Sequence, residues 1–351
     1  MSIEQKLQKN YSLQTSNTLG FSAFAEYFLA VRSEAELVAA IDYAQQNDLA
    51  VRVLGGGSNV LMAPQIDGLV IRIDIMGKKV LHEGVANRAL ATEVVDIVVG
   101  GGENWHETVE WSVAQSLSGM ETMALIPGRV GAAPVQNIGA YGQEMKDIVF
   151  KVRAYQLETG RFVELFNDDC GFAYRDSVFK QSPGQFIITE VVLRLSCHQD
   201  ESIRYAALQS YFRDQGISQP DIKQIFNAVC AVRRSKLPDP ELLGNAGSFF
   251  KNPVITQTQF DQLKLQWPGL VAYPENKGFM KLAAGWLIDQ CDWKGKRVGH
   301  VGVYEKQALV LVHFGGGDRT ELLALASDIQ ASVLATFSVE LEMEPQLFPF
   351  V

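Results

Sequence analysis

Two polar side chains stand in stretches where their chemistry could serve a bound ligand. Ser248 lies in the run 244–253, which reads Gly-Asn-Ala-Gly-Ser-Phe-Phe-Lys-Asn-Pro. It has neither a G-x-S-x-G elbow nor a histidine nearby, so serine-hydrolase chemistry is not expected. A serine held beside a ligand can instead donate a proton to a carbon centre. Arg175 lies in the aromatic, basic run 172–180 and is either a structural ion-pair partner or a fixed charge against an anionic group.

A glycine-rich turn is expected early in the chain. A strand predicted at 51–54 runs directly into Gly55-Gly56-Gly57-Ser58-Asn59. Consecutive backbone N–H groups in such a turn form a nest that binds phosphate oxygens. A plain glycine turn is the alternative, because the pattern is neither G-x-G-x-x-G nor a P-loop. A second glycine turn is predicted at 100–102.

The stretch 125–142 organises the rest of the chain. It reads Leu-Ile-Pro-Gly-Arg-Val-Gly-Ala-Ala-Pro-Val-Gln-Asn-Ile-Gly-Ala-Tyr-Gly, with Arg129 as its single charge. Glycine permits positive φ and lets a flat group approach the backbone. Gln136, Asn137 and Tyr141 add hydrogen-bonding groups among small residues. The stretch predicts either a backbone-lined wall of a ligand site or a buried loop with tight turns, and both interpretations stay open on these residues.

Two further features have a structural and a functional interpretation. A helix predicted at 222–234 leads into Arg233-Arg234-Ser235-Lys236. The helix dipole favours cations at its C-terminus, which explains the cluster, whereas the functional interpretation is a site for a diphosphate. His106 begins another predicted helix, and we interpret it as a cap or surface group rather than a catalytic residue.

Hydrophobic periodicity predicts the elements that would position these residues. Ser33 and Glu36 form a capping-box pattern before a helix that ends near Asn47. The strands expected between 150 and 195 suggest a meander. A change of composition between Cys197 and Pro220 predicts a domain junction. Further helices are expected at 106–117, 281–291 and 319–336, and strands at 68–73, 93–99, 150–157, 161–165, 186–195 and 308–313.

Composition limits the class of protein. The 351 residues are 47% hydrophobic and 20% charged, which fits a globular protein of two or three domains. A net charge of -9 argues against binding to a nucleic-acid backbone. Four scattered cysteines without a C-x-x-C favour a reduced, cytoplasmic protein. No signal peptide, membrane segment or metal site is expected, because apolar runs of the required length and histidine pairs at ligand spacing are missing.

Six stretches, in this order along the chain, together resemble one family. They resemble UDP-N-acetylenolpyruvoylglucosamine reductase, the flavoenzyme of bacterial peptidoglycan precursor synthesis. The resemblance extends from about residue 19 to 345 and includes the longer family type with a tyrosine-bearing segment at 202–212; the chain departs from the pattern after Glu344-Pro345. The six stretches are 55–59, 126–142, 174–177, 236–238, 244–253 and 281–291.

The resemblance implies an α+β protein that binds FAD. Two N-terminal subdomains, 1–75 and 76–215, would have the PCMH-type FAD-binding fold shared with p-cresol methylhydroxylase. A C-terminal α+β substrate-binding domain would cover 216–345, with a tail at 346–351. FAD would lie between the two subdomains, with its diphosphate against 55–59 and its ring against 127–142. The implied cofactor contacts are Gly55, Gly56, Gly57, Ser58, Asn59, Pro127, Gly128, Gly131, Ala132, Gln136, Asn137, Gly139, Tyr141 and Gly142.

The implied reaction reduces an enol-ether double bond conjugated to a carboxylate. NADPH would reduce the flavin, and hydride would pass from flavin N5 to C3 of the enolpyruvyl group. Ser248 resembles the proton donor to C2, while Arg175 and Glu344 resemble the pair that stabilises the enolic intermediate. A bare carboxylate would repel that intermediate, so Glu344 would be protonated or share a cation. The residues implied to hold the UDP-sugar are Tyr174, Tyr205, Lys236, Asn252, Tyr273, Lys294 and Gln307.

Two other functions compete with this one. An oxidase of the same FAD fold acting on an alcohol would explain the first half of the chain but not 236–253. A non-catalytic module that senses flavin or a sugar nucleotide would be expected to lack the catalytic residues, and all three are present. The resemblance also implies a cytoplasmic monomer whose partner is a UDP-sugar. A preference for NADPH over NADH does not follow from the residues, because no pocket for a 2′-phosphate can be located.

Overall fold

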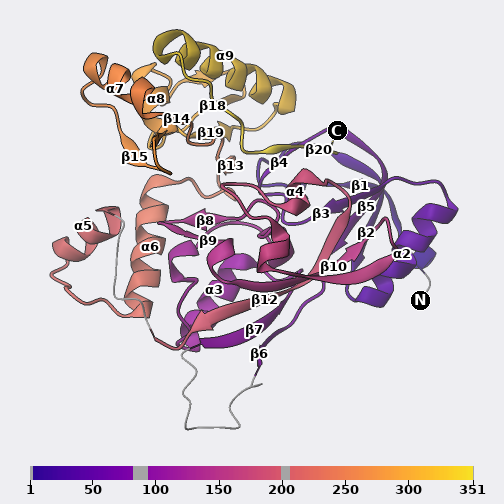
Figure 1. Ribbon diagram of the computed structural model, residues 1–351. Helices are drawn as coiled ribbons and strands as arrows, with labels where there is room; N and C mark the ends of the chain where they lie inside the picture. The colour runs from indigo at the N-terminus through magenta and orange to yellow at the C-terminus, as the bar shows by residue number, and fades with distance from the viewer. Residues whose placement is uncertain (1–2, 82–93, 199–205, 351) are drawn as a thin grey trace, which may run out of the picture. The chain divides into compact units, whose positions relative to one another are not determined.

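The computed structural model describes residues 3–81, 94–198 and 206–350 (Figure 1). These residues form two compact units, each with its own hydrophobic core. The predicted division at residues 75, 215 and 345 stays a prediction. The first unit comprises Met1–Tyr11, Ala25–Gly56 and Ile66–Ser235, and the second comprises Ser12–Phe24, Gly57–Gln65 and Lys236–Val351.

A four-stranded sheet with the order β1-β2-β5-β3 carries the first glycine turn. β3 and β5 run parallel, and β3 occupies the predicted residues 51–54. Ser33 caps α2 (Glu34–Gln46), the helix that precedes β3, as predicted: its Oγ accepts the Glu36 N–H at 3.2 Å. Leu37 and Ile41 of that helix pack into a core with the strands. The elements are α1 (Ile3–Lys6), β1 (Gln8–Ser12), β2 (Phe24–Val31), α2 (Glu34–Gln46), β3 (Val51–Leu54) and β5 (Gln65–Ile73).

A five-stranded antiparallel sheet, in the order β11-β10-β12-β7-β6, forms the centre of the first unit. The predicted meander is wrong, since β12 pairs with β10 and β7 rather than with β11. The reason is burial: β12 is buried along most of its length and needs two neighbours, whereas β11 has exposed residues and forms an edge. The strands are β6 (Lys78–Leu81), β7 (Val94–Gly100), β10 (Val149–Gln156), β11 (Arg161–Phe166) and β12 (Phe186–Ser196).

Two helices pack against this sheet in a common core. Val109 of α3 and Val229 of α6 are fully buried in the same cluster as Val191 of β12. The short strands β8 and β9 form a hairpin. Figure 1 shows α3 beside β12 and β7. The remaining elements of this unit are α3 (Trp105–Ala114), β8 (Gly139–Ala140), β9 (Gln143–Glu144), α4 (Val178–Gln181), α5 (Ala206–Asp214) and α6 (Ile222–Lys236).

The second unit contains one four-stranded sheet, one three-stranded sheet and a parallel strand pair. Their orders are β13-β19-β18-β17, β14-β16-β15 and β20-β4. Leu287 of α8 and Ile329 of α9 are fully buried in the core of this unit. Its strands are β4 (Val60–Met62), β13 (Gly244–Ser248), β14 (Val254–Thr256), β15 (Ala272–Pro274), β16 (Phe279–Leu282), β17 (Arg297–Val298), β18 (Val301–Val303), β19 (Val310–His313) and β20 (Gln346–Phe348). Its helices are α7 (Gln257–Gln266), α8 (Ala284–Gln290) and α9 (Arg319–Phe337).

One predicted helix of this unit begins too early. Lys281 and Leu282 were expected to be helical, but they belong to β16, where Lys281 pairs with Val254 and Tyr273. The helix starts only at Ala284, whose N–H donates to the side-chain oxygen of Asn252 at 3.0 Å. Pairing on both edges of β16 thus overrides the helical pattern. Among all helices of the described ranges, none has the length and apolarity to cross a lipid bilayer.

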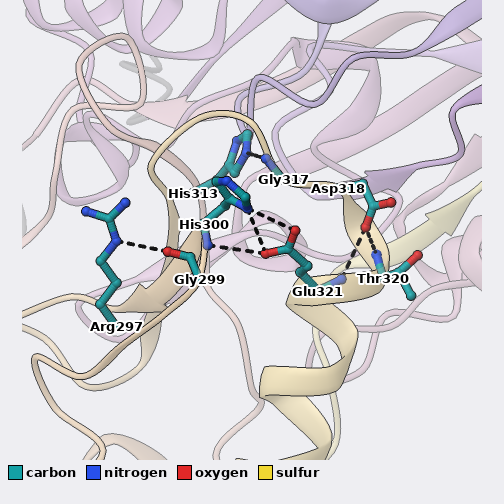
Figure 2. Close-up of polar contacts among 8 residues, drawn as sticks. All are labelled: Arg297, Gly299, His300, His313, Gly317, Asp318, Thr320 and Glu321. Carbon is teal, nitrogen blue, oxygen red and sulfur yellow. Dashed lines mark hydrogen bonds and ion pairs between the residues drawn. The ribbon is translucent and has the colours of Figure 1, made fainter.

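Polar contacts fix the start of α9 and the end of β19 (Figure 2). Asp318 accepts the N–H groups of Thr320 and Glu321 at 2.7 and 3.2 Å. His313 accepts the Gly317 N–H at Nε2, 3.0 Å away, and donates from Nδ1 to the Leu19 carbonyl at 2.8 Å. These partners define a neutral His313 ring with its proton on Nδ1. The strand that pairs with β13 is therefore anchored to both α9 and the segment 12–24.

Candidate active site

The stretch 125–142, called the glycine bed below, lies directly against the second glycine turn. Val130 donates its N–H to the Glu103 carbonyl and Gly131 donates to the Gly101 carbonyl, both at 2.9 Å. A Cβ on Gly131 would stand 3.0 Å from that same Gly101 oxygen. A side chain at this point would therefore press against the second glycine turn. The sequence predicted the turn at 100–102 but not its role, which is to support the glycine bed.

The first glycine turn also packs on the glycine bed. A Cβ on Gly55 would stand 2.9 Å from the Ala132 Cβ, and a Cβ on Gly56 would stand 2.8 Å from the Gly128 Cα. These two glycines let the two backbone segments approach closely. Gly57 belongs to the second unit, where its φ of +61° and the Ser16 carbonyl both exclude a side chain.

The single charge of the glycine bed is neutralised within the protein. Arg129 Nη1 donates to the Ile73 and Gly102 carbonyls at 2.9 and 2.7 Å. The same nitrogen forms an ion pair with Asp74 at 2.8 Å. Arg129 therefore fastens the bed to the end of β5 and to the second glycine turn. Its charge serves the scaffold.

Asn137 is fully buried at the centre of the glycine bed. Its Nδ2 donates to Glu144 Oε2 at 3.0 Å and to the Ala173 carbonyl at 2.9 Å. Its Oδ1 accepts the Lys146 N–H at 2.9 Å. The side chain thus holds together three segments of the chain, a scaffold role that the sequence did not indicate. Its predicted contact with a cofactor stays a prediction.

Arg175 is brought to the glycine bed by the turn that carries it. Its Nη2 donates to the Gly139 carbonyl at 3.0 Å, and its guanidinium lies 5.2 Å from the centre of the Tyr174 ring. Ala173 and Asp176 pair across this turn, and Arg175 itself has a φ of +57°. Ser177 is fully buried and donates to the Val135 carbonyl. Two of the predicted site stretches, 126–142 and 174–177, therefore form one structure.

The hairpin β8–β9 closes the glycine bed. Its two-residue turn consists of Tyr141 at φ +52° and Gly142 at φ +86°. Positive φ at both positions is the signature of a type I′ turn, which suits the twist of a hairpin. No atom lies within 4 Å of a Cβ built on Gly142. Space is therefore open at Gly142, a predicted cofactor contact, whereas Tyr141, the other predicted contact in this turn, packs against the core of the first unit.

In the second unit, Ser248 and Glu344 are held on adjacent backbone. Ser248 is exposed at the end of β13, after an irregularity between Asn245 and Ser248 in the pairing with β19. The next residue, Phe249, accepts the Glu344 N–H at its carbonyl, 2.9 Å away. Asn59 Nδ2 donates to the Glu344 carbonyl at 3.3 Å. Hydrogen bonds to the backbone of Glu344 therefore connect three predicted site segments: those of Ser248, Glu344 and Asn59.

Most of the residues predicted to hold the UDP-sugar lie in the second unit. Asn252 caps the start of α8, and Gln307 lies beside the first turn of that helix, 3.0 Å from a Cβ built on Gly285. Tyr273 is half exposed on β15. Lys294 and Lys236 are exposed, and Lys294 lies 3.4 Å from Asp289. Tyr174 lies beside Arg175 in the first unit, and Tyr205 lies outside the described residues.

The cationic end of α6 divides between the two units. Arg233 belongs to the first unit, where its Nη2 donates to the Leu125 carbonyl at 3.3 Å. Its Nε is buried without a hydrogen-bond partner among the described residues. Burial lowers the pKa of Arg233 from its ordinary value. Lys236 belongs to the second unit. The predicted diphosphate site at 233–236 stays a prediction.

Comparisons with known proteins place these observations in a family. Residues 25–165 match the FAD binding domain model, and residues 239–348 match the model for the C-terminal domain of UDP-N-acetylenolpyruvoylglucosamine reductase. The reductase of Polynucleobacter asymbioticus is 46% identical over 97% of this chain and 96% of its own length. That of Pseudomonas aeruginosa is 42% identical over 99% of this chain and 100% of its own. The chain belongs to the UDP-N-acetylenolpyruvoylglucosamine reductase family.

Membership of the UDP-N-acetylenolpyruvoylglucosamine reductase family confirms the predicted α+β fold, an FAD-binding region followed by the family's C-terminal domain. The solved reductase from Thermus caldophilus has the same fold, with a TM-score of 0.65 and 24% identity over 98% of both chains. The protein is accordingly an FAD oxidoreductase of peptidoglycan precursor synthesis. This result favours the reductase over both competing functions, the alcohol oxidase and the non-catalytic sensor.

The geometry of the glycine bed fits the FAD of a UDP-N-acetylenolpyruvoylglucosamine reductase. At Gly131 and Gly139 a Cβ would meet neighbouring backbone, so these glycines let the scaffold pack closely, whereas at Gly142 no atom lies within 4 Å of a Cβ and the backbone wall is open. A flat ring system needs such a wall, with backbone donors toward its polar edge. Among the described residues, no cluster of histidine, cysteine, aspartate or glutamate could hold a metal ion.

Proposed function

We propose that the protein reduces UDP-N-acetylglucosamine enolpyruvate to UDP-N-acetylmuramate, with NADPH as the reductant. The anchoring of Arg175 on the glycine bed carries this proposal, because it joins a fixed cation to the wall assigned to FAD. When bound, FAD supplies the hydride for C3 of the enolpyruvyl group. The protein must then stabilise negative charge on the carboxylate side and deliver a proton to C2.

Arg175 would stabilise that negative charge. An arginine guanidinium carries a delocalised positive charge and presents several donors in a fixed fork. The contacts to the Gly139 carbonyl and the Tyr174 ring limit its freedom before substrate arrives. A preorganised donor of this kind contributes about 3 to 4 kcal/mol to the stabilisation of an oxyanion in a transition state.

Ser248 would donate the proton to C2. A serine hydroxyl is a weak acid, so donation requires a strongly basic carbon centre and good alignment. The exposure of Ser248 at the end of β13 supports this role, since the hydroxyl is accessible there. Glu344 would stabilise the same enolic group, either protonated or sharing a cation. The hydrogen bond from its backbone N–H to the carbonyl of Phe249, the neighbour of Ser248, supports this role.

The remaining predicted residues would bind the cofactor and the nucleotide. FAD would be held by the 55–59 turn at its diphosphate and by the glycine bed at its ring. Asn252, Tyr273, Lys294, Gln307, Lys236, Tyr174 and Tyr205 would bind the UDP-sugar. We further propose a cytoplasmic monomer with the three-domain division given by the resemblance, without a nucleic-acid or membrane partner.

Stopped-flow absorbance with purified holoenzyme tests this function in two steps. NADPH should bleach the flavin band, and UDP-N-acetylglucosamine enolpyruvate should restore it. In Ser248→Ala, bleaching should stay within about twofold of wild type, while restoration should slow by about 10²- to 10⁴-fold. Ser332→Ala on α9 serves as the matched control and should change neither step. Equal damage to both steps in Ser248→Ala would refute the proton-donor role, and a wild type that is not reoxidised would refute the substrate.

A further inference from the structure

Leu125, the first residue of the glycine bed, has an unusual backbone conformation. Its φ is +57°, in the left-handed region that side chains other than those of glycine and asparagine seldom adopt. Such a conformation persists only where the surroundings hold it. Leu125 directly precedes Ile126-Pro127-Gly128, the part of the bed that contacts the 55–56 turn.

Two side chains from different helices hold both polar groups of Leu125. Its N–H donates to His106 Nδ1 of α3 at 3.2 Å, and its carbonyl accepts from Arg233 Nη2 of α6 at 3.3 Å. We call these three residues the Leu125 clamp. Trp105, the neighbour of His106, donates from its backbone N–H to the Gly128 carbonyl at 3.1 Å. It also donates from Nε1 to the Met123 carbonyl at 3.0 Å. The first turn of α3 therefore forms hydrogen bonds to the chain before, at and after Leu125, where the glycine bed begins.

The clamp requires a neutral imidazole. A ring nitrogen that accepts an N–H carries no proton, so a protonated His106 would turn its own Nδ1–H against the Leu125 N–H. The ring is partly buried and stacks on Phe226 of α6, with 5.6 Å between centroids and 6° between planes. This stacking restricts the rotation by which the ring could present its other nitrogen.

The charged and titratable groups around His106 come from α3 and α6. Burial is the main reason that the pKa of His106 lies below its ordinary value of 6.5. Glu110 and Glu107 of α3 raise this pKa, whereas Arg234 and Arg233 of α6 lower it. Cys230 of α6 lies among the same charges, and burial raises the pKa of its thiol, so it stays neutral.

We propose that His106 is a positioning residue for FAD, which holds the glycine bed in its receptive conformation only while its imidazole is neutral. The proposal rests on the assignment of the bed to the FAD ring under the proposed function. Because the clamped state disfavours protonation, FAD affinity should be constant above the ordinary pKa of histidine. It should fall as the pH drops below that value, since protonation then favours the released bed.

The test measures FAD binding to apoprotein between about pH 5 and pH 8, with quenching of flavin fluorescence as the signal. In wild type, the dissociation constant should rise about tenfold toward the acid end. His106→Asn keeps an acceptor near the position of Nδ1 but does not titrate, so its affinity should stay within about threefold of wild type at pH 8 and show no acid loss. His106→Phe keeps the stacking on Phe226 but has no acceptor, and its affinity should be about tenfold weaker across the range. His198→Asn removes an exposed histidine and should reproduce the wild-type curve.

Hydrogen exchange of the same proteins separates this proposal from the proposed function. FAD should protect amides of residues 127–142, and acid pH should release the Leu125 amide in wild type but not in His106→Asn. Absence of FAD protection in the bed would overturn its assignment to the ring, and this proposal with it. Protection of the bed together with coincident curves for wild type and His106→Asn would overturn the role of His106 alone. Wild-type affinity in His106→Phe would do the same.

Discussion

The glycine bed and the segment 244–252 both combine glycines with an asparagine, but Gly139 and Gly131 of the bed are glycines for a different reason from Gly247 of the segment. In the bed, a Cβ on Gly139 would stand 2.5 Å from the Gln143 carbonyl, and one on Gly131 would stand 3.0 Å from the Gly101 carbonyl. In the segment 244–252, no atom lies within 4 Å of a Cβ on Gly247, but φ there is +69°. Neighbours exclude a side chain at Gly139 and Gly131, whereas backbone conformation disfavours one at Gly247. Gly244, at the start of the segment, resembles the bed glycines, because its Cβ would meet the Leu19 carbonyl.

The two asparagines repeat this difference. Asn137 is fully buried and connects distant segments of the first unit. Asn245 acts locally: its Oδ1 accepts the Gly247 N–H at 3.0 Å, and its Nδ2 donates to the carbonyls of Pro238 and Leu243 at 3.2 and 2.9 Å. The bed is thus a wall made rigid by contact with the rest of its unit. The segment 244–252 is a bend that leads the exposed Ser248 out of the regular pairing with β19.

Removal of the Asn137 side chain should have the largest effect on stability. Asn137→Ala removes the hydrogen bonds from Asn137 Nδ2 to Glu144 Oε2 and to the Ala173 carbonyl, and the one that Asn137 Oδ1 accepts from the Lys146 N–H. The Ala173 carbonyl still accepts the Asp176 N–H at 3.1 Å. A lost hydrogen bond costs about 0.5 to 1.5 kcal/mol, and more where the partner is charged, so the free energy of unfolding should fall by about 3 kcal/mol. Urea denaturation monitored by tryptophan fluorescence measures this loss. A loss in Asn137→Ala no larger than that in Asn245→Ala would contradict the comparison, since, among the described residues, the Asn245 side chain bonds only to those within seven positions of it.

A side chain on Gly139 should have the next largest effect. Gly139→Ala places a methyl group 2.5 Å from the Gln143 carbonyl, so the β8–β9 hairpin must open. Overpacking of this kind costs about 2 kcal/mol, and the shift would also move the Gly139 carbonyl that anchors Arg175. Thermal unfolding gives the stability, and reoxidation of reduced enzyme by substrate gives the effect on Arg175.

The matched control for that variant is Gly142→Asn in the turn of the same hairpin. Space is open there, and asparagine tolerates the positive φ of +86° better than other residues with side chains do. This variant should lose less than about 0.5 kcal/mol of stability. A similar loss in both variants would mean that conformation, rather than contact, makes glycine necessary in the bed.

The sequence predicted local structure in the first unit but not the contacts between distant residues that hold the glycine bed. Ser33 as a helix cap and the strand at 51–54 depend on neighbouring residues, and both are confirmed. The clamp on Leu125 could not be predicted, because His106 and Arg233 lie 19 and 108 positions away from it. The sequence showed a polar residue in the first turn of a helix and a cation at the end of another. Nothing local indicated that both would reach one peptide unit.

The second unit was less predictable for the same reason, because contacts between distant residues determine its structure. The pairing of Phe250 with Met343 brings the chain after Ser248 beside Glu344, across more than 90 residues. Only the resemblance to a family placed Ser248 and Glu344 in one reaction. The helix predicted from Lys281 failed because β14 and β15 pair with both edges of 279–282, a tertiary contact that periodicity along the chain does not contain.

A side chain on Gly247 should cost less stability but more activity than one in the bed. Gly247→Ala must hold an alanine at φ +69°, which costs about 1 kcal/mol. If the strain is relieved by straightening the bend, Ser248 moves and the reoxidation step should slow by about tenfold, with no change in flavin reduction. Gly247→Asn should recover most of this rate, since asparagine tolerates the left-handed region. Unchanged reoxidation in Gly247→Ala would show that the bend does not position Ser248.

The smallest effect is expected at the start of α9, where a polar cap contributes to the stability of the second unit. Asp318 caps this helix, and Asp318→Ala should lower the free energy of unfolding by about 1 kcal/mol while both half-reactions keep their rates. The amides of Glu321 and Thr320 hold the pKa of Asp318 below its ordinary value of 3.8. The carboxylate therefore stabilises the fold fully above that value, and the stabilisation is lost as the pH falls through the lowered pKa. Thermal unfolding across this pH range should show the loss of stability in wild type but not in Asp318→Asn, which caps the helix without titrating. Slower reoxidation in Asp318→Ala or Asp318→Asn would mean that the position of Ser248 depends on the whole second unit rather than on its local bend.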